Sequence, residues 1–172
     1  MNRKSNSGLT FTTLKYPKFV LKIIKKTVML SSKQVAEYFI CLTDPDIGEI
    51  ISNLKLQKLV YYAQGFSLAL HGESLFEEDI LAWEHGPVVE SLYREYKEYK
   101  AQAIPQPDEF DISVFSDKQS ELIKEIYQVF GQFSAWKLRN MTHSEKPWIE
   151  TPRNQIIQHS LMQSFFKDYI VD

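Results

Sequence analysis

The segment Leu56–Val89, with the sequence LQKLVYYAQGFSLALHGESLFEEDILAWEHGPVV, decides how this chain is expected to fold. Its first half carries apolar residues at helical spacing and ends at Gly72, which suits the left-handed conformation that terminates many helices. After an acidic turn, a short apolar stretch at Ile80–Glu84 leads to Gly86 and Pro87. This order predicts a long helix, a short β element, and a second helix whose first residue is Pro87, where a missing N–H is tolerated.

The long helix is expected to run from Leu54 to about His71, with Asn53 as its N-cap. One stripe of apolar side chains at helical spacing should face the core: Leu56, Leu59, Val60, Ala63, Phe66 and Leu70. The side chains of Lys55, Lys58 and Tyr62 are expected to face elsewhere.

Further helices surround this one in the predicted order. Two segments with capping-box spacing, Ser31–Gln34 and Ser116–Gln119, should each begin a helix. Short helices are expected after Pro87 and at Ala135–Thr142, and a last helix should begin at about Pro152 or Asn154. The side chains expected to be buried on these helices are Val35, Tyr38, Phe39 and Leu42, then Val89, Leu92, Tyr93, Tyr96 and Tyr99, then Leu122, Ile126, Val129 and Phe133, and finally Ile157, Leu161, Phe165 and Tyr169. The fold class is therefore mainly α, a single compact helical domain with one short β element at about Ile80–Glu84.

Composition places this fold in a soluble protein. A chain of 172 residues that is 44% hydrophobic can build one core and is short for two. The single cysteine, Cys41, rules out an intrachain disulfide and suits a reducing compartment. No apolar run approaches the roughly 18 to 20 residues that cross a bilayer. We therefore expect a cytoplasmic protein.

Charge divides the chain into two parts. Residues 1–28 carry seven basic side chains and no acidic one, whereas residues 29–172 carry 13 basic and 22 acidic side chains, a net charge of −9. The domain is expected to span 29–172, behind a basic extension that is disordered or forms a short amphipathic helix. An acidic body lacks the electrostatic footprint of a nucleic-acid binder, and contact with a membrane is expected only through residues 1–28. Alternatively, translation starts at Met29.

Motifs of catalysis and metal binding are missing from the sequence. Its four histidines are scattered, and it contains no HExxH, CxxC, GxSxG or P-loop pattern. We therefore expect no catalytic residue, cofactor or metal ion. One alternative stays open, a small hydrolase-like or metal-dependent enzyme that uses His143 with Glu145. The spacing Thr142-x-x-Glu145 fits a capping box ahead of Pro147 equally well.

Three ordered blocks resemble a known family: LQKLVYYAQG at 56–65, LFEEDILAWEHGPVVESLYREYK at 75–97 and THSEKPW at 142–148. The sequence resembles the Panacea antitoxin domain, a phage- and prophage-associated family that includes the SocA-like proteolytic adaptors. The resemblance covers roughly Ser31–Ile170. Two features depart from it, since Glu90 stands where the family often has proline and the basic extension is not part of the domain.

The resemblance implies a protein that binds rather than catalyses. Its partner would be a cognate protein toxin, encoded by an adjacent gene, which is neutralised by direct binding or delivered to a protease of the AAA+ class. The motif residues then become candidates for partner contact: Tyr61, Tyr62, Gln64, Trp83, His85, Gly86, Pro87, Tyr93, Thr142, His143 and Trp148. The alternative is that Tyr61, Trp83, Tyr93 and Trp148 are core residues, because family motifs mark the fold more often than a contact surface.

Overall fold

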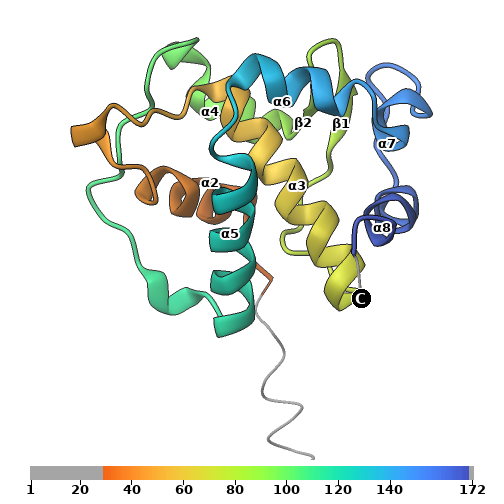
Figure 1. Ribbon diagram of the computed structural model, residues 1–172, viewed down its shortest axis with the longest axis horizontal. Coiled ribbons are helices and arrows are strands. Elements are labelled where there is room, and N and C mark those ends of the chain that lie inside the picture. The colour runs from red at the N-terminus through yellow and green to blue at the C-terminus, as the bar shows by residue number, and fades with distance from the viewer. Residues whose placement is uncertain (1–28, 171–172) are drawn as a thin grey trace, which may run out of the picture.

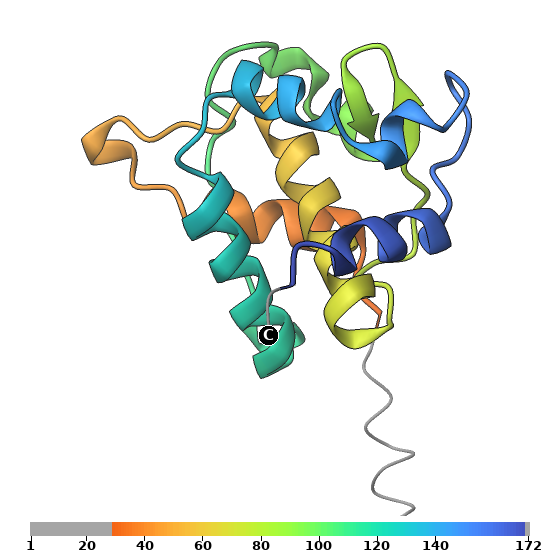
Figure 2. The same cartoon turned by 45° about the vertical axis from the view of Figure 1, so that its right-hand side comes forward.

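Helix α3 (Asn53–His71) runs through the centre of the molecule, and the other elements pack around it (Figure 1). The computed structural model describes residues 29–170. Five helices pack directly on α3: α2 (Ser32–Cys41), α4 (Glu90–Tyr96), α5 (Asp117–Phe130), α6 (Ala135–Thr142) and α8 (His159–Lys167). The turned view shows α8 crossing one end of α3 while α6 crosses the other (Figure 2). The mainly α fold class with one short β element is confirmed.

Side-chain caps set the helix starts, largely as the sequence predicts. Ser31 and Ser116 both form complete capping boxes with the glutamine three residues later, so α2 and α5 begin where expected. The N-cap of α3 is Ser52, whose hydroxyl accepts from the N–H of Lys55, and Asn53 is the first helical residue. The helix ends at Gly72 with φ of 70°, the left-handed cap that the sequence indicates.

A two-stranded antiparallel hairpin replaces the single β element of the prediction. Strand β1 (Leu81–Trp83) pairs with β2 (Gly86–Val88) around a turn at Glu84 and His85. The predicted helix start at Pro87 is wrong, because this residue lies in β2 and helix α4 (Glu90–Tyr96) begins three residues later. A proline is tolerated there because β2 is an edge strand.

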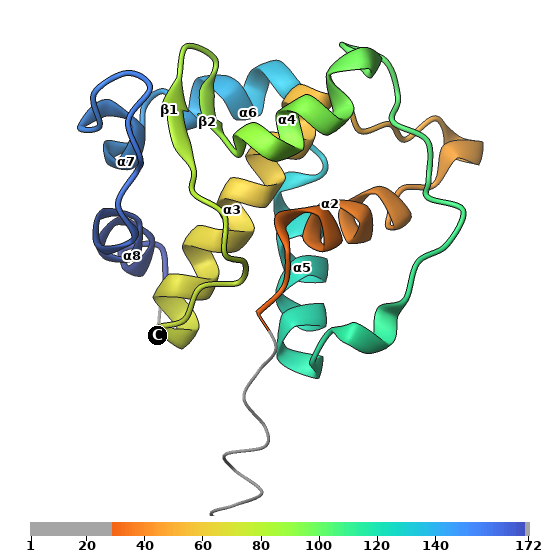
Figure 3. The ribbon, with the colours of Figure 1, turned by 180° about the vertical axis from the view of Figure 1, so that it is seen from behind.

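The other edge of β1 is covered by the chain that leads into α8. The N–H of Ala82 donates to the carbonyl of Gln155 at 3.0 Å, and Ile157 donates to Ile80 at 2.8 Å. Seen from behind, the hairpin leads into α4 across one end of α3 (Figure 3). Short elements complete the described chain: η1 (Pro45–Ile47), η2 (Lys97–Tyr99), η3 (Ile112–Val114) and α7 (Lys146–Ile149).

Helix α3 is buried on nearly every side, so the predicted division into core and wet faces is wrong. The side chains of Lys58 and Tyr62 are buried, at 0% and 1% exposure, although we expected them to face away from the core. Leu70, on the expected apolar stripe, is 45% exposed because it lies in the last turn, beyond the neighbouring helices. A helix that other elements surround must bury polar residues too, and periodicity does not reveal which ones.

The final helix differs from the prediction in both start and register. It begins at His159 rather than near Pro152, because the backbone of residues 154–157 hydrogen-bonds to Ile80 and Ala82 instead of forming a helix. Met162 and Phe166 are its buried residues, whereas Tyr169 is exposed. Elsewhere Tyr93 and Val129 are also exposed rather than buried.

No helix in the described part of the chain is long and apolar enough to cross a membrane. The predicted basic extension lies outside the described residues.

Candidate functional site

Two buried amides of α3 fix the backbone of the segment that follows it. The Oε1 atom of Gln64 accepts from the N–H groups of Leu75 and Phe76, at 2.7 and 3.3 Å. Earlier on the same helix, the Oε1 atom of Gln57 accepts from the N–H of Val89 at 2.9 Å. Because both amides are buried, losing either would leave backbone donors without partners in the interior. These contacts hold the segments on both sides of the hairpin against α3.

Lys58 lies beneath the hairpin and supports it. Its side chain is fully buried, and Nζ donates to the carbonyl oxygen of Pro87 at 2.8 Å. Burial lowers the pKa of Lys58 to about 7, and the charge of Arg139 adds to this effect. Gly86 has φ of 97°, and a Cβ there would lie 2.7 Å from Oγ1 of Thr142. Gly86 therefore combines a left-handed backbone conformation with a close approach to a neighbouring side chain, and both favour glycine.

Glu145 is held in the core by two tyrosines of α3. Its carboxylate accepts from the hydroxyl of Tyr61 at 2.9 Å and from that of Tyr62 at 2.8 Å. Burial raises the pKa of Glu145, and the two tyrosine hydrogen bonds oppose that shift. The carboxylate therefore connects α3 to the start of α7. The tyrosines of the block at 56–65 and the glutamate of the block at 142–148 thus have a role in folding.

His143 is not paired with Glu145. Its ring stacks on the indole of Trp148, with centroids 3.8 Å apart and planes 18° from parallel. Burial, followed by the charge of Arg139, lowers the pKa of His143 to about 4, so the ring is neutral at pH 7. The capping box predicted at Thr142 is wrong, since the threonine hydroxyl donates to the carbonyl of Arg139 at 2.9 Å.

The chemistry available to an enzyme at this place is limited. A nucleophile or general base needs an orienting partner within hydrogen-bond reach, and both carboxylate oxygens of Glu145 bond to tyrosines instead. Within residues 29–170, no group of three His, Cys, Asp or Glu side chains could hold a metal ion.

Aromatic side chains gather around the hairpin and form what we call the hairpin surface: Trp83, His85, Tyr93, Trp136 and Trp148. Tyr93 meets Trp83 edge to face with centroids 5.2 Å apart, and His85 lies 6.3 Å from Trp136. The indole N–H of Trp148 donates to the carbonyl oxygen of Trp83 at 2.9 Å. Trp136 is 62% exposed and Tyr93 is 40% exposed. Large rigid rings that remain accessible are typical of protein-binding surfaces.

Two cavities open on either side of the hairpin within this surface. The larger, of about 510 Å³, is walled by apolar side chains that include Leu54, Trp83, Val88 and Tyr93. The smaller, of about 410 Å³, lies toward α6 and α7 and is lined by residues that include Arg139, His143 and Trp148. The two share Trp83 and the ion pair between Glu84 and Arg153.

Comparison with protein families places this chain. The family model described as "Antitoxin SocA-like, Panacea domain" matches residues 56–149, more than half of the chain. The chain belongs to the SocA-like Panacea antitoxin family. Membership implies an antitoxin function and a cognate toxin as the partner, and it argues against an enzyme. Comparison with curated proteins and with solved structures gives no match.

The Panacea motif residues separate into two groups in the structure. Six are buried and support the hairpin or the core: Tyr61, Tyr62, Gln64, Gly86, Pro87 and Thr142. The other five lie together around the hairpin: Trp83, His85, Tyr93, His143 and Trp148. Among the four aromatic residues that could be either core or contact residues, Tyr61 is buried in the core. The other three border the cavities: Trp83, Tyr93 and Trp148.

Sequence reasoning missed three residues of this region of the Panacea domain. Lys58 was expected on the wet face of its helix, and Trp136 and Arg139 were assigned no role. Arg139 lies over the ring of Trp136, with its guanidinium carbon 5.8 Å from the centroid. Their spacing of three residues on α6 predicts this contact, but only the tertiary structure brings the pair to the hairpin.

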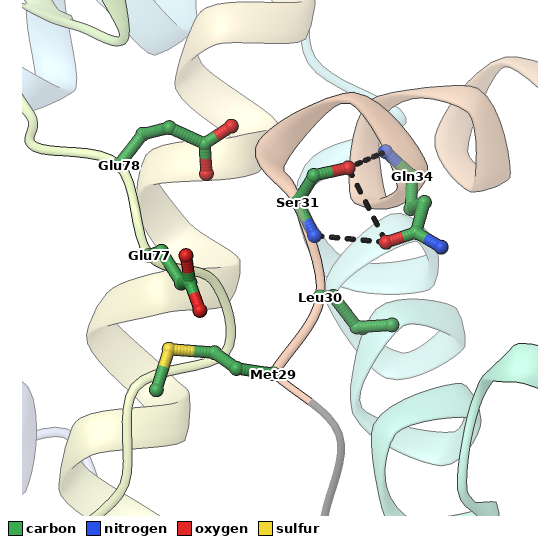
Figure 4. A pocket seen from close by; sticks show the side chains of 6 residues that line it. All are labelled: Met29, Leu30, Ser31, Gln34, Glu77 and Glu78. Atoms are coloured by element: carbon green, nitrogen blue, oxygen red, sulfur yellow. Dashed lines mark hydrogen bonds between the residues drawn. The ribbon is translucent and has the colours of Figure 1, made fainter.

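A separate shallow pocket of about 440 Å³ lies at the start of α2 (Figure 4). Glu77 and Glu78 line one side of it, and the capping box of Ser31 and Gln34 lines the other (Figure 4). The carboxylate of Glu78 already accepts from the N–H and hydroxyl of Ser32, at 2.9 and 2.7 Å. We therefore assign this pocket to the fixing of α2 rather than to a ligand.

Proposed function

We propose that this Panacea protein neutralises its cognate toxin by direct binding through the hairpin surface. The observation that carries the proposal is the cluster of accessible aromatic rings around two adjoining cavities, made by residues of two family motif blocks and by Trp136. Trp and Tyr dominate the energetics of protein interfaces because they bury a large area at a small entropic cost. Cavities beside them provide pockets for side chains of the partner.

Rigidity of the hairpin supports the same proposal. Lys58 holds Pro87, and Gln57 holds Val89, so the strand and the start of α4 are fixed before any partner arrives. Preorganised surfaces lose less conformational entropy on binding, and affinity rises accordingly. The buried motif residues thus contribute to binding indirectly, by positioning the exposed ones.

The alternative enzyme built on His143 and Glu145 receives less support. The carboxylate is turned into the core toward two tyrosines, and the imidazole stacks on Trp148. A histidine that lacks a carboxylate partner and has its pKa lowered to about 4 is a poor general base at neutral pH.

Co-expression tests the proposal most directly. The product of the adjacent gene is expressed alone and with this protein, and growth is measured. We expect toxicity alone and rescue by the wild-type antitoxin. A neighbour that is harmless alone would contradict the toxin-neutralising function.

Single substitutions then locate the surface. Trp136→Ala should weaken toxin binding by about tenfold or more, as expected for an aromatic anchor of an interface. The matched control is Ile47→Ala, because Ile47 is also well exposed, at 73%, and lies on η1 away from the hairpin. Equal loss of affinity in both variants, or loss in neither, would remove the hairpin surface from the proposal.

Toxin abundance separates direct neutralisation from delivery to a protease. Direct binding leaves the toxin level unchanged during rescue, whereas an adaptor lowers it in a protease-dependent way. We expect unchanged abundance and a stable complex on gel filtration. Rescue that disappears in cells lacking the AAA+ proteases would favour the adaptor function instead.

A further inference from the structure

The cavities of the hairpin surface are basic, although the protein around them is acidic. Residues 29–172 carry 13 basic and 22 acidic side chains. Four of the basic ones line the two cavities: Lys97, Lys100, Arg139 and Arg153. Among the lining residues in the described part of the chain, Glu84 is the only acid, and its carboxylate is already paired with Arg153. The local charge is therefore opposite to that of the body.

In the part of the chain that the structure describes, three of these cations form no ion pair. Within residues 29–170, no ion pair joins Lys97, Lys100 or Arg139 to a carboxylate. The guanidinium of Arg139 donates to the side-chain oxygen of Asn140 at 3.1 Å, but its buried Nε has no hydrogen-bond partner in the structure. The charge of Arg139 is therefore not balanced by a carboxylate within residues 29–170.

From these observations we infer that the hairpin surface binds an acidic segment of the partner protein, with Asp or Glu side chains on either side of an apolar one. This inference rests on the proposed function and names the chemistry of the partner that it requires. The apolar side chain enters the larger cavity, between Leu54, Val88 and the ring of Tyr93. One flanking carboxylate pairs with Lys97 and Lys100 at that cavity, and the other meets Arg139 in the smaller one.

Geometry favours carboxylates on a protein over the phosphates of a nucleic acid. The larger cavity has apolar walls, which suit an apolar anchor, and the body that surrounds it has a net charge of −9, which repels an extended polyanion. An arginine fork pairs with a carboxylate through two parallel hydrogen bonds. Arg139 lines the smaller cavity, and within residues 29–170 no carboxylate forms an ion pair with it.

Charge reversal tests this inference on the full-length protein. Affinity for the purified toxin is measured for wild type, for Lys97→Glu with Lys100→Glu, and for the control Lys118→Glu with Lys124→Glu. The control changes net charge equally, at two exposed lysines of α5 that do not border the hairpin. We expect about tenfold weaker binding for the cavity variant, mostly through slower association, and little change for the control. Thermal melts check that all three proteins are folded.

Each outcome has one meaning. Failure of the wild type to bind the toxin contradicts the proposed function itself. Toxin binding that is equal in all three proteins, or equally weakened in both variants, overturns the acidic-segment inference alone. Toxin variants with single Asp or Glu residues changed to Lys should include one that restores binding to the cavity variant, and absence of any such rescue contradicts direct pairing. Displacement of the toxin by a DNA or RNA oligonucleotide would assign the basic cavities to phosphate.

Discussion

Gly86 is the residue on which the hairpin depends most directly. It combines a left-handed φ with a neighbouring Thr142 hydroxyl that would lie 2.7 Å from an added Cβ. Gly48 also has a positive φ, of 81°, but nothing lies within 4 Å of its ideal Cβ. Substitutions at Gly48 therefore report backbone strain alone, whereas substitutions at Gly86 report backbone strain and steric overlap together.

We expect Gly86→Ala to destabilise the protein more than Gly48→Ala does. The left-handed conformation alone costs a non-glycine residue about 1 to 2 kcal/mol, and overpacking adds about 1 to 3 kcal/mol at Gly86 only. Denaturant unfolding of both variants measures the difference. Equal losses would show that Thr142 and Lys58 move aside without cost.

Lys58 gives the folded protein a dependence on pH. Its pKa falls from 10.5 to about 7 on burial, so between pH 7 and 9 the unfolded chain binds more protons than the folded one. The free energy of unfolding should therefore rise with pH across this interval, by at most about 1.4 kcal/mol per pH unit. Replacing Lys58 with methionine removes the titrating group while keeping a long side chain in the core.

We expect the melting temperature of the wild type to rise between pH 7 and 9 more than that of Lys58→Met. Other titrating groups are common to both proteins, so the difference between the two curves isolates Lys58. Parallel curves would show that the ammonium is not the source of the rise.

At the level of elements, the close contact between α3 and α8 depends on a single residue, Gly65. A Cβ on Gly65 would overlap the ring of Phe166, which is itself 1% exposed and packs edge to face against Tyr61. Glycine is therefore required here for close helix approach, at a position where the backbone is ordinary helix.

We expect Gly65→Ala to destabilise the fold by about 1 to 3 kcal/mol through overpacking. Phe166→Leu should relieve the overlap, so the double variant should lose less than the sum of the single losses. Denaturant unfolding of the four proteins completes the cycle. Strict additivity would show that the two residues do not compete for the same space.

Helices with side-chain caps could be predicted from the sequence, because capping is local. The Ser31 and Ser116 boxes and the Gly72 stop all have their causes within a few residues. The second strand could not be predicted, because Pro87 suits a helix start by local rules. In the fold it pairs with Ala82 of β1, and Lys58, far away in sequence, binds its carbonyl oxygen. Residues 154–157 likewise hydrogen-bond to Ile80 and Ala82, which lie far away in sequence, and the final helix is shorter than expected for this reason.

In the candidate site too, features with local causes could be predicted and features that depend on distant residues could not. Family motifs indicated the hairpin region, but local sequence could not distinguish Trp83, beside a cavity, from Tyr61, buried on a carboxylate. Both are aromatic residues at apolar positions. Trp136 and Arg139 reach the hairpin only because α6 packs beside β2. Spatial neighbours of this kind need the tertiary fold.

For the molecule as a whole, the first described residues already pack into the core. The N–H of Leu30 donates to the carbonyl oxygen of Leu75 at 3.3 Å, and the Leu30 side chain is buried. The N-cap of α2 at Ser31 follows directly. These contacts are all formed among residues 29–170. The sequence before Met29 carries seven basic side chains and no acid.

We therefore expect a protein that starts at Met29 to melt within a few degrees of the full-length protein, since a domain of this size shifts by about 2 to 4 °C per kcal/mol. Calorimetry of the two proteins provides the measurement, and toxin binding by both provides the functional comparison. A much larger fall in melting temperature would show that residues 1–28 pack on the domain. Native stability with lost toxin neutralisation would instead assign the basic segment a part in the action of the antitoxin, separate from its folding.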